Sequence, residues 1–309
     1  MEENILKVSG ITKTFGGVTA LSDVSMEIRK GEIHCLAGEN GCGKSTLIKI
    51  VSGFYKPDCG TIEINGKEHT QMSPIESLKE GIQVIYQDFS IFPNLTVAEN
   101  VAMSSVLING EKRVSKKKMW ETAKTALDRI GADIPLNKDV ELLSVAEKQL
   151  VAIARSIIFN AKLIIMDEPT ASLTRKEVEA LFNVIHALKA EGISIAFVSH
   201  KLEEIFEICD RITILSNGKN VISGDISEFD KKKIVYYMTG RNYNDERLAQ
   251  PPQDADPILE VNGLTREHAF KDISFKLYPG EVLGITGLLG SGRTELAQAL
   301  SGMGSITSG

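Results

Sequence analysis

The stretch GENGCGKS, residues Gly38 to Ser45, decides the fold, because it lies between the apolar run EIHCLAG and a helical pattern that begins near Lys44. Its glycine and lysine spacing is typical of a phosphate-binding loop, in which backbone N–H groups curl around phosphate oxygens and a helix N-terminus adds its positive dipole end. In such a loop Lys44 reaches the β- and γ-phosphates and the Ser45 hydroxyl ligates Mg²⁺. The strand-loop-helix context favours a nucleoside triphosphate site over a chance glycine-rich turn.

Three further apolar runs end in polar residues that suit the same ligand. GIQVIYQ ends in Gln87, LIIMDE ends in Asp167 and Glu168, and ISIAFVSH ends in His200. Ligands of open parallel sheets bind at the carboxyl ends of the strands, so we expect these side chains to converge on one site. Asp167 is predicted to coordinate Mg²⁺, and Glu168 to orient and polarise the attacking water.

The alternation of these runs with helical patterns predicts an α/β fold with a mainly parallel core sheet covered on both faces. RITILS, residues 211–216, is a further expected strand. Residues of about 90–160 are mostly helical in pattern, which predicts a helical subdomain inserted in the α/β core.

Composition excludes several classes of protein. The 309 residues carry a net charge of -6, which disfavours a general nucleic-acid binder. No apolar run approaches the roughly 20 residues that span a bilayer, and the N-terminus lacks the pattern of a secretion signal. The four cysteines match no zinc-binding spacing, so we expect reduced thiols.

An internal repeat predicts two related domains. ILKVSGIT at Ile5–Thr12 returns as ILEVNGLT at Ile258–Thr265, and GENGCGKSTL returns as GLLGSGRTEL. We therefore expect a first domain over residues 1–243, a polar, proline-containing linker over 244–256 and the beginning of a second domain over 257–309. The second copy has far fewer residues than the first, so the sequence is expected to be truncated early in its second domain.

The first copy resembles the nucleotide-binding domain of ABC ATPases over its whole length. The resemblance depends on the phosphate-binding loop, on LSVAEKQ at the signature position and on LIIMDEPT, in that order along the chain. It implies an ABC-type P-loop NTPase fold with an additional antiparallel β subdomain, and ATP with Mg²⁺ as ligands. It also implies that Gln87 joins the Mg²⁺ site to the helical subdomain and that His200 contacts the γ-phosphate.

The resemblance extends the site. Phe15 is expected to stack on adenine and Ser144 to contact ATP held by an opposing domain. The metal ligands are expected to be Ser45, Gln87 and Asp167, and the catalytic residues Glu168, His200 and Gln87. The expected nucleotide-binding residues are Phe15, Gly38, Asn40, Gly41, Cys42, Gly43, Lys44, Ser45, Thr46 and Ser144.

A closer similarity is to ATPases of monosaccharide importers, which fuse two such domains in one chain. It depends on the repeat, DEPTASLT, SHKLEEIFEICDR, MTGR and the second loop GSGRT. It implies transmembrane permease subunits, a solute-binding protein acting through the permease and a second nucleotide-binding domain as partners, at the cytoplasmic face of the cell membrane. Three alternatives stay open: an importer ATPase for nucleosides or a sugar-derived signal, a soluble ABC ATPase without a membrane partner, and a purely regulatory ATP-binding module.

Several residues depart from the family pattern. Val145 and Ala146 replace the signature glycines, and Glu147 replaces its glutamine. In the second copy Arg293 stands at the position of Lys44 and His268 at that of Phe15. These departures predict one competent ATP site, built on Lys44 and Glu168, and one degenerate site.

Cys42, inside the phosphate-binding loop, has two possible roles. A thiol beside Lys44 and a helix N-terminus could be reactive, in which case alkylation would block ATP binding and ATP would protect the thiol. The alternative is an inert small side chain that fills space beneath the loop.

Overall fold

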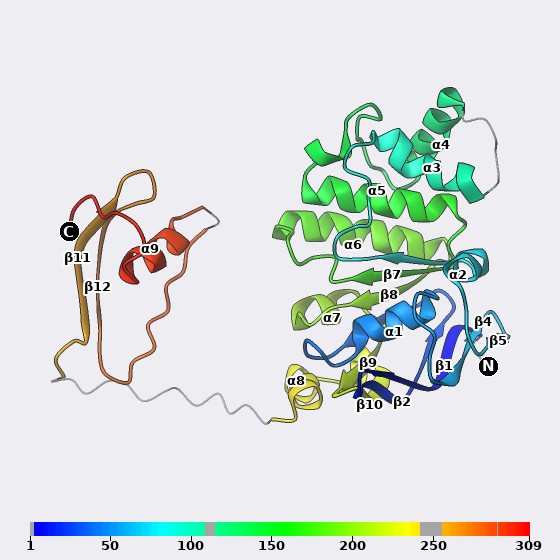
Figure 1. Ribbon diagram of the computed structural model, residues 1–309, viewed down its shortest axis with the longest axis horizontal. Helices are drawn as coiled ribbons and strands as arrows, with labels where there is room; N and C mark the ends of the chain where they lie inside the picture. Colours follow the sequence, from blue (N-terminus) through cyan, green and yellow to red (C-terminus); the bar gives the residue numbers. More distant parts are fainter. Residues whose placement is uncertain (1–2, 109–114, 242–254, 289) are drawn as a thin grey trace. The chain divides into compact units, whose positions relative to one another are not determined.

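The computed structural model describes residues 3–108, 115–241, 255–288 and 290–309. The chain divides into two compact units, Met1–Tyr243 and Asn244–Gly309 (Figure 1). Of the linker expected over 244–256, only residues 255 and 256 are described.

A six-stranded sheet forms the centre of the first unit. Its order is β10-β9-β3-β8-β7-β6, and every neighbouring pair is parallel except β10 with β9. The predicted mainly parallel core sheet is confirmed. The four strands β3, β7, β8 and β9 are almost wholly buried, as expected for apolar runs covered on both faces. The strands are β3 (Ile33–Ala37), β6 (Ile82–Ile85), β7 (Leu163–Asp167), β8 (Ser194–Val198), β9 (Arg211–Ser216) and β10 (Lys219–Asp225).

A second, antiparallel sheet has the order β2-β1-β4-β5. Side chains from this sheet share a core with helix α1 (Lys44–Val51) and with one face of the central sheet. The antiparallel subdomain implied by the family resemblance is therefore present, and it lies against the helix that follows the phosphate-binding loop. Its strands are β1 (Asn4–Phe15), β2 (Val18–Arg29), β4 (Cys59–Ile64) and β5 (Lys67–His69).

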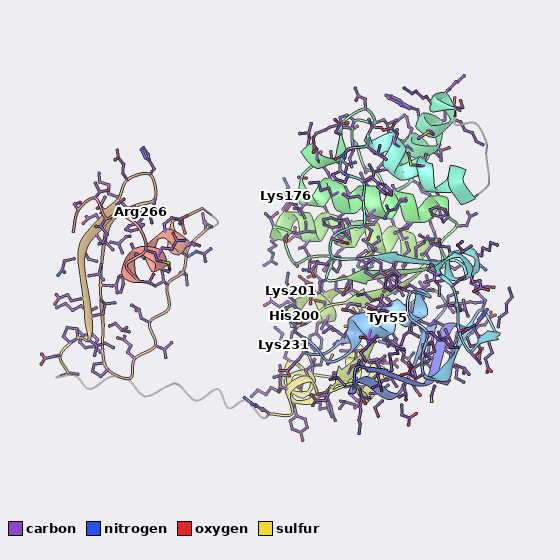
Figure 2. The ribbon with its side chains drawn as sticks, viewed as in Figure 1. Tyr55, Lys176, His200, Lys201, Lys231 and Arg266 are labelled. Carbon is purple, nitrogen blue, oxygen red and sulfur yellow. The ribbon has the colours of Figure 1, made fainter. Side chains whose placement is uncertain are left out.

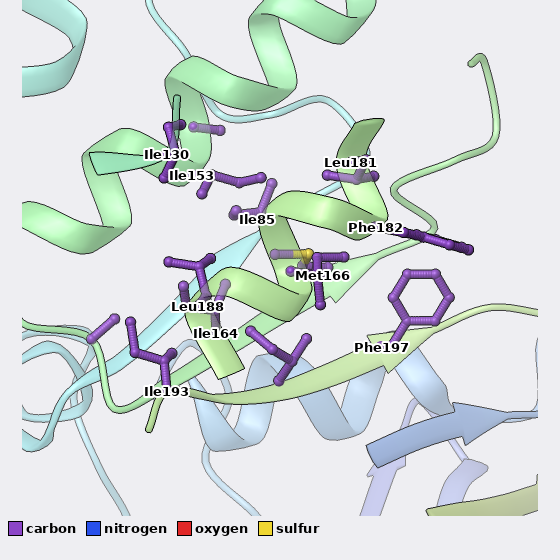
Figure 3. Close-up of a cluster of buried hydrophobic side chains, with 14 of the residues drawn as sticks. Ile85, Ile130, Ile153, Ile164, Met166, Leu181, Phe182, Leu188, Ile193 and Phe197 are labelled. Atoms are coloured by element: carbon purple, nitrogen blue, oxygen red, sulfur yellow. The ribbon is translucent and has the colours of Figure 1, made fainter. Parts of the chain in front are cut away.

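Helices cover the other face of the central sheet. The larger core lies between this face and α5 and α6, with Ile153 and Phe182 packed towards Ile85, Met166 and Phe197 (Figure 3). Helices α3, α4 and α5 contact one another in the region predicted to be helical. The helices are α2 (Pro74–Glu80), α3 (Val97–Ile108), α4 (Lys116–Arg129), α5 (Val145–Ile158), α6 (Arg175–Ala190), α7 (Leu202–Ile208) and α8 (Lys231–Thr239).

The described residues of the second unit form an antiparallel hairpin and one helix. Strands β11 (Leu259–Arg266) and β12 (Phe270–Leu277) pair with each other, and α9 (Arg293–Leu300) packs against them. Among the residues 255–288 and 290–309, the buried cluster consists of Val261, Leu264, Leu296 and Ala299. In the described parts of both units, every helix is too short or too polar to cross a bilayer.

Candidate functional site

A cavity of about 420 Å³ opens at the carboxyl ends of the parallel strands. It collects residues from four separate stretches of chain: Ala20 of β2, the phosphate-binding loop with the start of α1, the segment after β6 and the end of β7. Among the predicted catalytic and metal-binding residues, His200 alone is not part of its lining. The lining residues are Ala20, Asn40, Gly41, Gly43, Lys44, Ser45, Thr46, Gln87, Asp167 and Glu168.

Two of the loop glycines, Gly38 and Gly43, are required by close packing. Gly43 has φ 106°, and a Cβ there would lie 2.6 Å from Leu21 Cδ2 and 2.8 Å from the Ala20 carbonyl oxygen. A Cβ on Gly38 would lie 2.3 Å from the Leu215 carbonyl oxygen. Glycine tolerates both the positive φ and the close approach. Sequence reasoning missed Ala20, whose small side chain and main chain lie directly against the loop.

Lys44 is held inside the loop. Its ammonium group donates hydrogen bonds to the carbonyl oxygens of Gly38 at 2.7 Å and Glu39 at 2.9 Å, and the residue is buried. The lysine at the start of α1 therefore carries its charge directly at the loop that would enclose a phosphate group.

The two carboxylates after β7 lie in different environments. Burial, and secondly the charge of Glu168, raise the pKa of Asp167, while Lys44 and Lys49 lower it less. Glu168 has φ 47°, a left-handed conformation that is strained for a side chain of this kind, and its N–H donates to the Val198 carbonyl at 3.0 Å. Strain of this kind concentrates at functional sites.

The donor set beside Asp167 suits a hard divalent cation. The hydroxyl of Ser45, the amide of Gln87 and the Asp167 carboxylate line the same cavity. Oxygen ligands of this kind suit Mg²⁺, which keeps several waters and uses substrate phosphates as further ligands. A bound cation would also offset the repulsion between the two neighbouring carboxylates.

His200 contacts Glu168 directly. Its Nδ1 lies 3.0 Å from Glu168 Oε1, and about half of the imidazole is exposed. The ends of β7 and β8 thus bring the two side chains together across 32 residues of sequence. In Figure 2, His200 and Lys201 lie next to each other at the start of α7.

A buried network beneath this pair escaped sequence reasoning. The carboxylate of Glu204 accepts hydrogen bonds from Thr170 Oγ1 at 2.6 Å and Ser199 Oγ at 3.2 Å. It also pairs with Lys201 at 3.0 Å. Two consecutive glutamates lie on α7, and the structure places one of them, Glu204, on the buried side of the helix with Ile205 and Ile208.

Phe15 lies outside the cavity lining and is 40% exposed. Tyr55, which sequence reasoning also missed, packs edge-on against it with ring centroids 5.1 Å apart (Tyr55 is labelled in Figure 2). The Lys13 ammonium lies 5.3 Å from the Phe15 centroid. An exposed ring held in this way is available for stacking by a planar group.

Cys42 is buried beneath the loop. The residue is 4% exposed, its Sγ is 3.9 Å from Lys44 Nζ, and a Cβ on Gly38 would lie 2.5 Å from the sulfur. Burial leaves little access for an alkylating reagent, so the geometry favours the small space-filling role over the reactive thiol.

Ser144 and Glu147 cap helix α5 and lie apart from the cavity lining. The Glu147 N–H donates to Ser144 Oγ at 3.2 Å, and the Ser144 N–H donates to the Glu147 carboxylate at 2.7 Å. This backbone hydrogen bond is the main reason that the pKa of Glu147 is lowered. The signature segment is thus satisfied internally and places a negative charge at the helix N-terminus.

The chain is similar to proteins of a known family. The ABC transporter family model matches residues 21–171. The ribose import ATP-binding protein RbsA of Bacillus licheniformis is 43% identical over 304 residues, which are 98% of this chain and 62% of that protein. The protein of the same name from Clostridium perfringens is 45% identical over 312 residues, 99% of this chain and 61% of that protein. The chain therefore spans about 60% of the length of these curated relatives.

Solved structures give the same result. An ATP-binding cassette of an ABC transporter in its ADP conformation has a TM-score of 0.69 and 29% identity, covering 77% of this chain and 99% of that chain. A second structure of an ATP-binding cassette of an ABC transporter has a TM-score of 0.68 and 30% identity, covering 77% of this chain and 98% of that one. The family resemblance inferred from the sequence motifs is confirmed: the chain belongs to the ATP-binding cassettes of ABC transporters.

Proposed function

We propose that this chain is the ATP-binding and ATP-hydrolysing part of an ABC importer that couples Mg-ATP hydrolysis to uptake of a monosaccharide. The observation that carries the proposal is the cavity in which Lys44, Ser45, Gln87, Asp167 and Glu168 meet. The cavity brings together an ammonium group, a hydroxyl, an amide and two carboxylates. These are the groups needed to bind a triphosphate and its metal and to orient an attacking water.

Each residue has a distinct proposed task. Lys44 and the loop amides bind the phosphate groups, because charge-assisted hydrogen bonds to phosphate oxygens are short and strong. Glu168 accepts a proton from the attacking water or orients it. His200, held 3.0 Å from Glu168, reaches the terminal phosphate. Phe15, supported edge-on by Tyr55, stacks on the adenine.

Ser45, Gln87 and Asp167 would hold Mg²⁺, which would neutralise phosphate charge. The raised pKa of Asp167 is consistent with this role, since burial disfavours its charge until a cation is close.

We further propose that the two ATP sites of the complete transporter differ. The site on Lys44 and Glu168 is competent. The site that would use the Ser144 segment is degenerate, because the capped Ser144 and the charged Glu147 offer a triphosphate little attraction. This chain alone is expected to bind ATP but to hydrolyse it slowly, well below the roughly 1 per second of an ordinary enzyme, because the signature segment that would complete the site on Lys44 and Glu168 belongs to the second domain.

The sugar and the partners are inferred from relatives. The relatives named ribose import ATP-binding proteins support a monosaccharide as the transported solute. Transmembrane permease subunits would dock on the cassette, with a solute-binding protein acting through them at the other face of the membrane. The cassette would then work at the cytoplasmic face. Uptake tests with the co-purified permease, across sugars and nucleosides, decide between the candidate solutes.

A binding measurement on this chain tests the central claim. Lys44→Ala is expected to weaken Mg-ATP binding about 100-fold, because roughly two charge-assisted hydrogen bonds are lost. Arg293→Ala, the matched change in the second loop, is expected to change it less than about 2-fold. Isothermal titration calorimetry measures both. Equal losses for the two variants would contradict the proposal.

A further inference from the structure

Glu204 is a buried carboxylate with an unusually complete set of partners. The residue is 8% exposed and lies on the core side of α7, beside the buried Ile205. One carboxylate oxygen accepts hydrogen bonds from Thr170 Oγ1 and Ser199 Oγ, and the other pairs with Lys201 Nζ. A charge in this position is costly unless it is hydrogen-bonded and paired, and here it is both.

The same groups also bond to one another. Lys201 Nζ donates to the Thr170 carbonyl oxygen at 2.9 Å, and the Lys201 N–H donates to Ser199 Oγ at 3.1 Å. The network therefore forms a closed set of contacts around Glu204. It ties the segment that follows β7 to the segment that follows β8.

The catalytic pair of the proposed mechanism lies between these anchors. Glu168 precedes Thr170 by two residues, and His200 lies between Ser199 and Lys201. Glu168 is held in a left-handed backbone conformation, so its side-chain position depends on fixed neighbours on both sides. If Glu204 only filled space in the core, an apolar side chain of similar volume would serve as well. A carboxylate with three donors instead fixes the relative positions of the groups that donate to it.

We propose that Glu204 is a positioning residue that sets where the His200 imidazole lies relative to Glu168 and the terminal phosphate. This inference rests on the proposed function, because it assigns Glu204 a role in distinguishing ATP from ADP. His200 is the group that would contact the γ-phosphate, and the Glu204 network fixes the turn that carries it.

The test is nucleotide discrimination by the full chain. Dissociation constants are measured for a non-hydrolysable ATP analogue and for ADP, both with Mg²⁺. His200→Ala should reduce the preference for the analogue by roughly tenfold, the size of one hydrogen bond to a charged group. Glu204→Gln should also reduce the preference for the analogue, while its affinity for ADP stays within about twofold of the wild-type value. In the His200→Ala background, Glu204→Gln should have no further effect on the ratio.

Glu32→Gln is the matched control. Glu32 is 7% exposed and bonds to the buried His34 at 3.0 Å, but it lies at the beginning of β3, the opposite end of the strands. This change should alter both affinities equally, if at all. If Glu204→Gln does not fold by circular dichroism, Thr170→Val removes the 2.6 Å hydrogen bond and carries the same measurement.

Two results would overturn the inference. One is an unchanged analogue-to-ADP ratio in Glu204→Gln and Thr170→Val, with both affinities reduced together. The other is an equal loss of discrimination from Glu204→Gln in the presence and absence of His200. A wild-type chain that binds neither Mg-nucleotide would instead overturn the proposed function, so the two failures are distinguishable.

Discussion

The two glycine loops of the chain have the same local geometry in very different surroundings. Gly43 and Gly292 both precede a helix and have φ values of 106° and 83°. In the hairpins before them, Asp23 and Asp272 have φ values of 54° and 55°. The N–H of Gly10 donates to the Ser25 hydroxyl, and the N–H of Gly263 donates to the Ser274 hydroxyl at nearly the same distance. Short-range sequence determines these features in both units.

The segments that lead into the two glycine loops differ. In the first unit β3 is wholly buried and pairs in parallel with β8 and β9, whose residues lie far along the chain. Residues 281–288 of the second unit form no strand, and within the described residues they have no sheet partner. Val282, Ile285 and Leu288 are 75%, 47% and 85% exposed. An apolar run becomes a strand only when neighbouring strands satisfy its backbone groups.

Hydrogen exchange should sharpen this contrast most strongly. Amides of β3 are buried and hydrogen-bonded on both sides, so they should exchange only through opening of the core. Those of Leu283–Thr286 should exchange at least about 1,000-fold faster, because nothing in the described chain pairs with them. Exchange of the whole chain followed by mass spectrometry or NMR measures both segments at once.

The internal control is the backbone amides of two hairpins, β1-β2 in the first unit and β11-β12 in the second. Both pairs should be protected, since each is closed by its own antiparallel ladder. Equal protection of β3 and Leu283–Thr286 would mean that the segment before the second loop is ordered without a partner strand, and strand formation there would not depend on neighbouring strands.

This contrast also explains what the sequence could and could not predict. The strand RITILS coincides with β9, and the expected loop residues Asn40, Gly41 and Lys44 line the cavity, because hydrophobic runs and glycine spacing are local signals. The mainly parallel sheet followed from runs that are apolar on both faces. Single-sequence patterns therefore determined the fold class and most of the cavity.

Contacts between distant segments could not be predicted in this way. Tyr55 supports Phe15 across 40 residues of sequence, and Arg155 of α5 donates to the carbonyl oxygens of Phe89 and Ser90 after Gln87. Tyr55 and Arg155 lie outside every motif recognised in the sequence, so no local signal marked them. Cys42 shows the reverse case, because its motif position suggested reactivity while packing beneath Gly38 buries the thiol.

A pair of alanine substitutions should break the local similarity of the loops. Gly43→Ala would place a Cβ 2.6 Å from Leu21 in the main core and force a positive φ on alanine. We expect a loss of about 2 kcal/mol, or roughly 4–8 °C in the main unfolding transition. Gly292→Ala meets an equally close atom, the Ala269 carbonyl oxygen at 2.4 Å, but should leave the main transition unchanged because its effect stays within the second unit.

Differential scanning calorimetry measures the two variants beside Gly66→Ala. Gly66 also has a positive φ, 79°, but a Cβ there meets no atom within 4 Å. This control isolates backbone strain, which should cost about 1 kcal/mol. A main transition that falls equally in Gly43→Ala and Gly292→Ala would show that the second unit is part of the same cooperative core.

The smallest expected effect concerns Asp167 and Glu168, the carboxylates that follow β7 and face the first loop. The described residues of the second unit contain no strand that corresponds to β7, so the second loop has no such carboxylates beside it. Burial and the charge of Glu168 raise the pKa of Asp167, so its ionised form is less favourable in the folded state than in the unfolded chain. The contribution of this group to stability is therefore fully present below its unfolded pKa and is lost as the pH rises through the folded pKa. Without nucleotide or Mg²⁺, Asp167→Asn should raise the Tm by about 2 °C at about pH 7.5.

The gain should shrink as the pH falls through the raised pKa of the folded wild-type carboxyl, and it should be absent below about pH 3.9, the ordinary pKa of an unfolded aspartate. Added Mg-ATP should reverse the order, because ligand binding stabilises the wild type by mass action and the variant lacks a metal ligand. Thermal scans across pH, with the exposed Asp133→Asn as a control expected to match the wild type, measure each step. An Asp167→Asn chain that is less stable than the wild type at neutral pH would show that the carboxylate is favourably paired, so the first loop would not depend on a cation to balance the charges it faces.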